Sequence, residues 1–300
     1  MDNPDTGSSY VPVQGFLPRR GNHKWNGTAW VNAGLEIESA AATNLLLNTA
    51  TLATQSKTVA AVAHTLHFTG TGSVTLTGAS TAGPLVGTGT GEENRVSLTF
   101  TPSAASLTLT VSGTVSAAQL EVGSVPSSYI PTNGATATRI AQTASIAGAK
   151  MPAYTDAVSL AFKGDVTYAD TNSSNEAIFY VWQSSLSNFI NSSLRTQGSR
   201  TGQLEVYQRE ETSGQDLASG GGRSFSPNTN VPFNIASRHG STFINGAIGG
   251  TAFTADTTPT AIADLSGVAF ELVIKGTMNL AQVLVWPEDI GDTGIEEASA

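Results

Sequence analysis

Residues 96–112 read VSLTFTPSAASLTLTVS, and the spacing of their apolar side chains decides the fold class. Val96, Leu98 and Phe100 alternate with serine and threonine, and Leu107–Val111 repeats the pattern. Successive side chains of a strand point to opposite faces. The alternation therefore predicts antiparallel strands with one buried face and one face covered by hydroxyl groups.

The same period of two extends over the first half of the chain. Val74 and Leu76 alternate with threonines, and glycine-threonine stretches at residues 70–72 and 87–91 are typical of turns. The further strand candidates in this half are Leu45–Leu47, Ala60–Phe68 and Ala117–Val122. Six to eight such strands predict a jelly-roll-like sandwich.

The second half repeats the theme with more aromatic residues. Its candidate strands are Ser159–Tyr168, Ala177–Gln183, Asn188–Arg195, Leu204–Arg209, Pro232–His239, Thr242–Ile244, Ala269–Lys275 and Leu280–Trp286. Asn245-Gly246 favours a hairpin turn, residues 210–230 with Gly220–Gly222 are the longest expected loop, and Asp289–Ala298 is the expected helical segment. We expect a second β-sandwich.

Two segments outside these strands have distinct expectations. Residues 1–44 look irregular, although His23–Trp30 could form a hairpin around Asn26-Gly27. Trp25 and Trp30 are expected to pack on a neighbouring domain or subunit, with display as sugar-stacking platforms as the alternative.

The other segment is residues 117–139, AAQLEVGSVPSSYIPTNGATATR, between the two halves. Gly123 and Pro126 break the preceding strand, and Pro126 and Pro131 bias the residues before them toward extended geometry. The segment is therefore expected to be an ordered crossing that is neither helix nor loose linker.

Composition excludes several classes of protein. The 300 residues include no cysteine, so neither disulfides nor a thiolate metal site is available. Residues 1–150 carry seven acidic and seven basic residues, and residues 151–300 carry sixteen and seven, which argues against nucleic acid as a partner. No apolar run suits a membrane span, and the N-terminus does not resemble a signal peptide. Synthesis in the cytoplasm is expected.

Two motifs resemble a module of bacteriophage and prophage virion proteins. They are GLEIE followed by TNLLLN at residues 34–48, and QLEVG with SSYIPT and TR at residues 119–139. In that family the module looks like a carbohydrate-binding jelly roll. It is often followed by a concanavalin/laminin-G-like sandwich, to which residues 241–246 and 276–287 are similar. The resemblance implies a head spike or tail fibre, or the equivalent in a gene transfer agent, that is commonly homotrimeric and binds host polysaccharide.

Metal binding has two candidate clusters. His64 and His67 are three apart, and on a strand they point to opposite faces, so we expect one inward and one surface histidine. Asp165, Asp170 and Asn172, with Asn175 and Glu176 beside them, offer oxygen ligands for Ca²⁺, but capping of a turn explains the same residues. Calcium is thus a possible cofactor, and no other cofactor is expected.

Carboxylates and aromatic rings give the remaining candidates. Glu92-Glu93 and Glu210-Glu211 are sequence neighbours, whereas a glycosidase needs two carboxylates facing each other across a bond; distant pairs such as Glu205 with Glu176 or Glu271 stay open. The candidate sugar-facing rings are Tyr180, Trp182, Tyr207 and Trp286. Tyr180 and Trp182 share one strand face and Phe179 and Val181 the other, and the core is the competing location for either pair.

These observations predict an all-β chain of three parts. Residues 1–33 form an arm that docks to the virion or to another subunit, residues 34–139 a jelly-roll-like sandwich and residues 140–300 a concanavalin-like sandwich. Trp25, Trp30, Gly123, Tyr129, Pro131 and Arg139 are the expected interdomain or assembly residues. The expected function is non-enzymatic binding of host polysaccharide at the virion surface. The alternatives are a structural decoration protein without ligand and a polysaccharide depolymerase.

Overall fold

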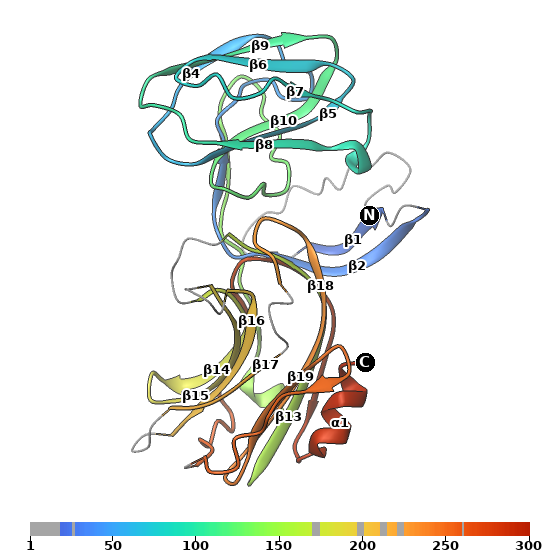
Figure 1. The fold of residues 1–300 in the computed structure, drawn as a ribbon, viewed down its shortest axis with the longest axis vertical. Coiled ribbons are helices and arrows are strands. Elements are labelled where there is room, and N and C mark those ends of the chain that lie inside the picture. Colours follow the sequence, from blue (N-terminus) through green and yellow to red (C-terminus); the bar gives the residue numbers. More distant parts are fainter. Residues whose placement is uncertain are drawn as a thin grey trace. The chain divides into compact units, whose positions relative to one another are not determined.

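The computed structural model describes residues 19–25, 28–169, 175–196, 201–210, 215–220, 225–259 and 261–300. They form antiparallel sheets and one short helix, which confirms the predicted all-β sandwich class (Figure 1). The chain divides into two compact units. The first unit is formed mainly by Ala41–Ala141, and the second by Ala33–Ala40 with Gln142–Ala300. Among the described residues, no helix has the length and apolarity needed to cross a membrane.

The first unit has nine strands and a 3₁₀ turn η2 (Glu92–Asn94). The strands are β3 (Ala42–Asn44), β4 (Gln55–Thr58), β5 (His64–Gly70), β6 (Ser73–Gly78), β7 (Leu85–Val86), β8 (Val96–Phe100), β9 (Ser106–Ser112), β10 (Val115–Val122) and β11 (Ala137–Arg139). They pair in the orders β4-β9-β6-β7, β10-β5-β8 and β11-β3.

The core of the first unit comes from the predicted alternation. Leu107 and Leu109 of β9 are fully buried together with Val74 and Leu76 of β6, against Leu66 on the facing sheet. Burying each such side chain stabilises the fold by about 1.5–3 kcal/mol. The predicted strand at residues 45–47 is wrong. The paired residues are instead Ala42–Asn44 of β3, and residues 45–47 belong to the loop that follows them.

The second unit is a sandwich of two larger sheets. One sheet has the order β1-β2-β22-β13-β18-β19-β20, and the other β12-β21-β14-β15-β16-β17. The strands are β1 (Arg19–Trp25), β2 (Trp30–Glu38), β12 (Ala144–Ile146), β13 (Ala157–Thr167), β14 (Asn175–Ser185), β15 (Asn188–Arg195), β16 (Gln203–Arg209), β17 (Gln215–Gly220), β18 (Val231–Gly240), β19 (Ile244–Ile248), β20 (Thr251–Ala252), β21 (Phe270–Lys275) and β22 (Thr277–Trp286). A 3₁₀ turn η3 (Gly148–Lys150) precedes β13.

Stacked aromatic rings fill the space between these two sheets. Phe162, Tyr180 and Phe270 stack on one another, with the ring centroids of Phe162 and Phe270 lying 4.8 and 5.4 Å from that of Tyr180, and Trp182 meets Phe270 edge-on at 5.8 Å. Such pairs add about 0.5–1.5 kcal/mol beyond the area that they bury. On the other face of the seven-stranded sheet, helix α1 (Gly291–Ala298) packs Ile295 among small alanines, at the predicted helical segment (Figure 1).

Three predictions about this unit are wrong. Residues 34–38 do not open the first sandwich: β2 pairs with β22, and Ile37 lies in the aromatic core. Residues 19–25 and 30–38 are strands on either side of the predicted hairpin turn, so this part of the arm is not irregular. The loop at 210–230 contains β17, which the sequence pattern missed.

The predicted turn at Asn245-Gly246 is also wrong. Both residues lie inside β19, opposite Arg238 and Ser237, and Asn245 is fully buried. The two-residue turn falls at Gly249-Gly250, where both φ angles are positive, as a type I′ turn requires.

Candidate functional site

Parts of the two motifs that carry the family resemblance lie side by side in the first unit. β3 pairs with β11, so that Thr43 lies opposite Thr138 and their hydroxyl groups hydrogen-bond at 2.8 Å. The buried amide of Asn44 donates to the carbonyl groups of Ala118 and Ile130, at 2.9 and 2.8 Å. Asn44 therefore joins β10 to the segment that follows it.

Thr49 fixes the loop after β3 against the segment around Thr132. Its N–H donates to the carbonyl of Thr132 at 3.2 Å, and its hydroxyl oxygen accepts from the N–H of Thr132 at 3.0 Å. The hydroxyl groups of Thr132 and Tyr129 lie 3.0 and 2.9 Å from the same oxygen. Because Thr49 and Thr132 are buried, water competes little for these bonds, and the two backbone segments are held in place.

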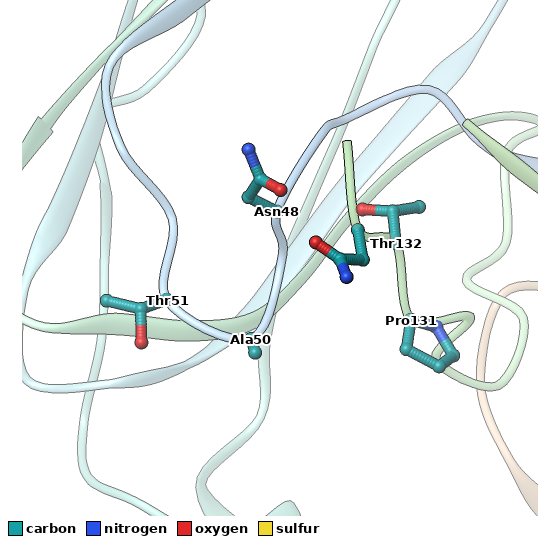
Figure 2. Close-up of a pocket in the computed structure, with 6 residues that line it drawn as sticks. Asn48, Ala50, Thr51, Pro131 and Thr132 are labelled. Carbon is teal, nitrogen blue, oxygen red and sulfur yellow. The ribbon is translucent and has the colours of Figure 1, made fainter. Parts of the chain in front are cut away.

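An open pocket of about 670 Å³ lies between these segments. It is lined by Asn48, Ala50, Thr51, Pro131, Thr132 and Asn133. Figure 2 shows Asn48, Ala50 and Thr51 on one side, with Pro131 and Thr132 on the other. The pocket is thus built on the same two segments that Thr49 joins.

Asn48 combines a structural bond with an exposed donor. Its φ of 55° is a left-handed conformation that asparagine tolerates better than most residues. Its Oδ1 accepts from the N–H of Gly134 at 2.8 Å. Within the described part of the chain, its Nδ2 and the exposed side chains of Thr51 and Asn133 have no hydrogen-bond partner. These neutral groups are available to a ligand.

Next to the pocket, residues 123–130 cover the polar face of β10-β5-β8. Gln119 accepts from the N–H of Ile130 at 2.6 Å and donates to the hydroxyl of Ser127 at 3.0 Å. The hydroxyl of Thr65 donates to the carbonyl of Gly123 at 2.8 Å. The segment is therefore the ordered, non-helical crossing that its prolines predicted, and the first unit uses it to satisfy its own polar side chains.

The centre of this covered face is a charged network around His67. Nε2 of His67 lies 3.2 Å from the carboxylate of Glu121, and Nδ1 lies 2.9 Å from a guanidinium nitrogen of Arg95. Since arginine can only donate, Nδ1 accepts and the imidazole proton is on Nε2. Glu121 also accepts from the N–H and hydroxyl of Ser127, at 2.7 and 2.6 Å. Arg95 also makes an ion pair with Glu92, at 2.6 Å.

Both pKa shifts in this network favour a neutral imidazole and an ionised carboxylate. Burial lowers the pKa of His67 below its usual value, aided by the charge of Arg95. Burial alone would raise the pKa of Glu121, but hydrogen bonds from His67 and Ser127 hold it below its usual range. The hydroxyl of Ser127 faces the carboxylate rather than the imidazole, which differs from a nucleophile–base pair. The network stabilises the fold.

The structure corrects the expectation for the two histidines. They do face opposite sides of β5, but neither is at the surface: both are at most 1% exposed. His64 stacks on Phe100 in the core and hydrogen-bonds the carbonyl of Val62 at 2.8 Å. Sequence reasoning could not find the partners Arg95 and Glu121, which are close only after folding.

The other predicted assembly residues are placed as follows. Tyr129 bonds Thr49, and its ring lies 5.6 Å from the guanidinium of Arg95, so these contacts are within the first unit. Pro131 lines the pocket, Gly123 has a φ of 138° at the end of β10, and Arg139 ends β11. Trp25 ends β1 and the partly buried Trp30 begins β2. Their assembly role stays a prediction.

The predicted sugar-facing rings are mostly inside the second unit. Tyr180 and Trp182 are at most 1% exposed and cannot stack on a sugar, so this prediction is wrong for both. Phe179 and Val181 are buried as well, and a bulge after Ile178 breaks the simple alternation. Trp286 is half-buried beside helix α1, and Tyr207, 6% exposed, lies on the face of β16 that points away from the aromatic core.

The candidate calcium ligands are only partly described. Asp165 accepts from the amides of Asn230 and Asn279, at 2.6 and 2.9 Å, while Asp170 and Asn172 lie outside the described residues. In the described ranges, no three histidine, aspartate or glutamate side chains group in a way that could hold a metal ion. Calcium binding stays a prediction.

The carboxylate pairs are likewise accounted for in part. Glu92 is bound by Arg95. Glu205 is fully buried and accepts from the hydroxyl of Tyr207, while Glu271 is exposed. Glu211 and the side chain of Glu176 lie outside the described residues.

Comparisons with known proteins identify no family. No family model matches the chain, and no curated protein sequence matches it. The botulinum neurotoxin serotype G binding domain is similar over 49% of this chain and 37% of its own, with 11% identity and a TM-score of 0.38. The Ruminococcus gnavus IT-sialidase CBM40 bound to α2,3-sialyllactose is similar over 53% and 93%, with 10% identity and a TM-score of 0.37. The NanB sialidase from Streptococcus pneumoniae is similar over 51% and 26%, with 16% identity and a TM-score of 0.38. TM-scores this low do not indicate what the chain binds.

Proposed function

We propose that this chain is a non-enzymatic glycan-binding protein, and that its pocket between residues 48–51 and 131–133 holds a neutral sugar. One observation carries the proposal: the exposed polar side-chain groups of the pocket are uncharged amides and hydroxyls, mounted on a fixed backbone. Ala50 and Pro131 add apolar surface beside them.

The chemistry of these groups suits a sugar. Each sugar hydroxyl both donates and accepts, as does an amide or a threonine hydroxyl. An uncharged pocket avoids the cost of taking a charge out of water when a neutral ligand binds. The bonds of Thr49 order the loop before binding, which reduces the entropy that the ligand must overcome.

We further propose that the glycan is a host surface polysaccharide and that the chain is a homotrimeric virion spike or fibre. The support is the resemblance of the TNLLLN and SSYIPT motifs, which flank the pocket, to virion proteins. Residues 1–33 would dock to the particle. Deletion of these residues is expected to abolish incorporation into particles, and light scattering of the purified chain is expected to give three times the monomer mass.

Asn48→Asp is the sharpest test of the pocket. The variant keeps the side-chain oxygen that accepts from the N–H of Gly134, and aspartate also tolerates a positive φ. It replaces the exposed Nδ2 donor by a negatively charged oxygen. We expect at least tenfold weaker binding of neutral oligosaccharides, measured by titration calorimetry after a glycan array, with little change in Tm.

Asn228→Asp is the matched control. Asn228 is exposed, has a φ of 61° and lies in the second unit, so this variant should bind as the wild type does. A wild-type chain that binds no neutral glycan on the array would favour a decoration protein without ligand. Release of new reducing ends from polysaccharide would favour a depolymerase.

A further inference from the structure

The outward face of β15 and β16 in the second unit gathers polar side chains in cross-strand rows. Opposite residues of an antiparallel pair share a face, and Ser192 and Val206, which lie opposite each other, point toward the core side. Their neighbours therefore point outward. The outward pairs are Arg195 with Gln203, Ser193 with Glu205, and Asn191 with Tyr207. The strands lie beside β14 and β17 in Figure 1.

Several buried polar atoms on this face lack a hydrogen bond. Among the described residues, Oδ1 of Asn191, Oγ of Ser193, Oε1 of Gln203 and Nε of Arg195 have no partner. Ser193 itself is only 1% exposed. Buried polar groups are nearly always bonded, because leaving one unsatisfied is costly. These four atoms gather on this face, whereas Oγ of Ser192 and Oε1 of Gln208 are the unpartnered atoms that the structure describes on the core side of the same two strands.

The charges on this face favour an anionic partner. The guanidinium of Arg195 is 3.8 Å from the carboxylate of Glu205, near the outer limit of an ion pair, and that carboxylate already accepts from Tyr207. Ile178 of β14 lies opposite both Ser193 and Lys275, so Lys275 belongs to the same face. With Arg209 at the far end, the described residues of this face include three basic groups and the two carboxylates of Glu205 and Glu271, in a chain whose net charge is −9.

We propose that this face is a second ligand site, which takes a carboxylate-bearing saccharide. Arg195 presents a planar guanidinium that can hold a carboxylate through two parallel hydrogen bonds. Ser193, Asn191 and Gln203 then bond the sugar hydroxyls. The rows from Asn191 to Arg195 cover five residues, or about 13 Å of strand, which is long enough for a disaccharide. The inference does not rest on the neutral-sugar pocket, which lies in the other unit.

Ser193→Ala separates a ligand site from a structural role. Removing a buried hydroxyl without a partner should leave stability unchanged or slightly higher. In a ligand site the same change should weaken binding about fivefold. Ser192→Ala is the matched control, since Ser192 is equally buried and its hydroxyl is also without a partner, but it points to the core side. Arg195→Lys, which keeps the charge and loses the planar fork, should weaken binding at least tenfold.

The probes are uronate- and neuraminate-bearing oligosaccharides beside their methyl esters, which differ only in charge. The full chain is screened on an array and titrated with the best ligand. We expect the acid form to bind at least tenfold more tightly than its ester, Ser193→Ala to weaken it, and Asn48→Asp and Ser192→Ala to have no effect. The proposal is overturned if no acidic probe binds better than its ester, or if Ser193→Ala and Arg195→Lys bind as the wild type does. If Asn48→Asp alone lost binding of the acidic probe, the acidic ligand would bind in the pocket of the first unit. That result would overturn the second site and leave the neutral-sugar pocket standing.

Discussion

Two faces of this molecule use the same kinds of side chain and treat them differently. In the first unit, Thr65, His67 and Glu121 lie on a polar sheet face that residues 123–130 cover and bond. In the second unit, Ser193 and Arg195 lie on a polar sheet face where several buried atoms have no bond within the described residues. A polar face satisfied by its own chain stabilises the fold. A polar face left unsatisfied is a candidate for binding something else.

The largest expected effect comes from breaking the covered face. Glu121→Ala leaves His67 and Ser127 without their shared acceptor in a buried site. Each hydrogen bond to a charged group contributes about 1.5–3 kcal/mol, so the bonds from these two residues together contribute about 3–6 kcal/mol. We expect the free energy of unfolding of the first unit to fall by about that amount in urea titrations.

Glu92→Ala is the control for this change. It removes the partly exposed partner of Arg95, which bonds the other ring nitrogen of His67, and a loss of at most about 1 kcal/mol is expected. If both variants lost the same free energy of unfolding, the claim that the buried hydrogen bonds of Glu121 stabilise the first unit would be contradicted.

The next largest expected effect is a loss of stability of the second unit in acid, caused by a histidine in its core. Burial lowers the pKa of His239 to about 3, and its Nε2 lies 3.0 Å from the hydroxyl of Tyr180. The unfolded chain takes up a proton on this imidazole below pH ~6.5, whereas the folded chain does not until about pH 3. Unfolding thus binds a proton in this window, and stability falls by about 1.4 kcal/mol per pH unit as pH decreases.

His239→Gln removes this titration while keeping a polar side chain. The unfolding midpoint of the second unit in the variant should depend less on pH between 6 and 4 than in the wild type. An unchanged slope would assign the acid sensitivity to other groups, such as the lowered pKa values of His67 and Glu121 in the first unit.

The smallest expected effect compares one hydroxyl on each face. The hydroxyl of Thr65 lies 2.9 Å from that of Thr99 and donates to Gly123, so Thr65→Val should cost about 1–2 kcal/mol. Ser193→Ala should cost nothing measurable, because its hydroxyl has no partner to lose. Equal costs, measured by thermal unfolding, would remove the distinction between the two faces.

Local sequence predicted the strands well and their partners poorly. The alternation in β6 and β9 follows directly from burial of one face, so Val74 and Leu107 could be placed in the core from the sequence alone. The sheet that a strand joins depends on distant residues, so the sequence alone places residues 34–38 of β2 in the wrong sandwich. Asn245-Gly246 resembles a turn, but the buried amide of Asn245 instead bonds Asp292 at 2.8 Å, 47 residues later.

The candidate site was visible in part. The TNLLLN and SSYIPT motifs contain Asn48, Pro131 and Thr132, but their meeting around Thr49 requires the folded chain. Thr51 and Asn133 carry no sequence signal of their own. Apart from Tyr207, Glu205 and Glu271, the face around Arg195 carries no sequence signal, because a pattern of alternating residues does not tell whether a polar atom has found a partner.

The most direct measurement is a hydrogen-exchange footprint of the full chain with its best neutral glycan. Binding at the pocket predicts slower exchange of the amides at residues 48–51 and 131–134, with β5 and its covering segment 123–130 unchanged. Protection that falls on the covered face, or outside both candidate sites, would contradict the distinction between satisfied and available polar groups.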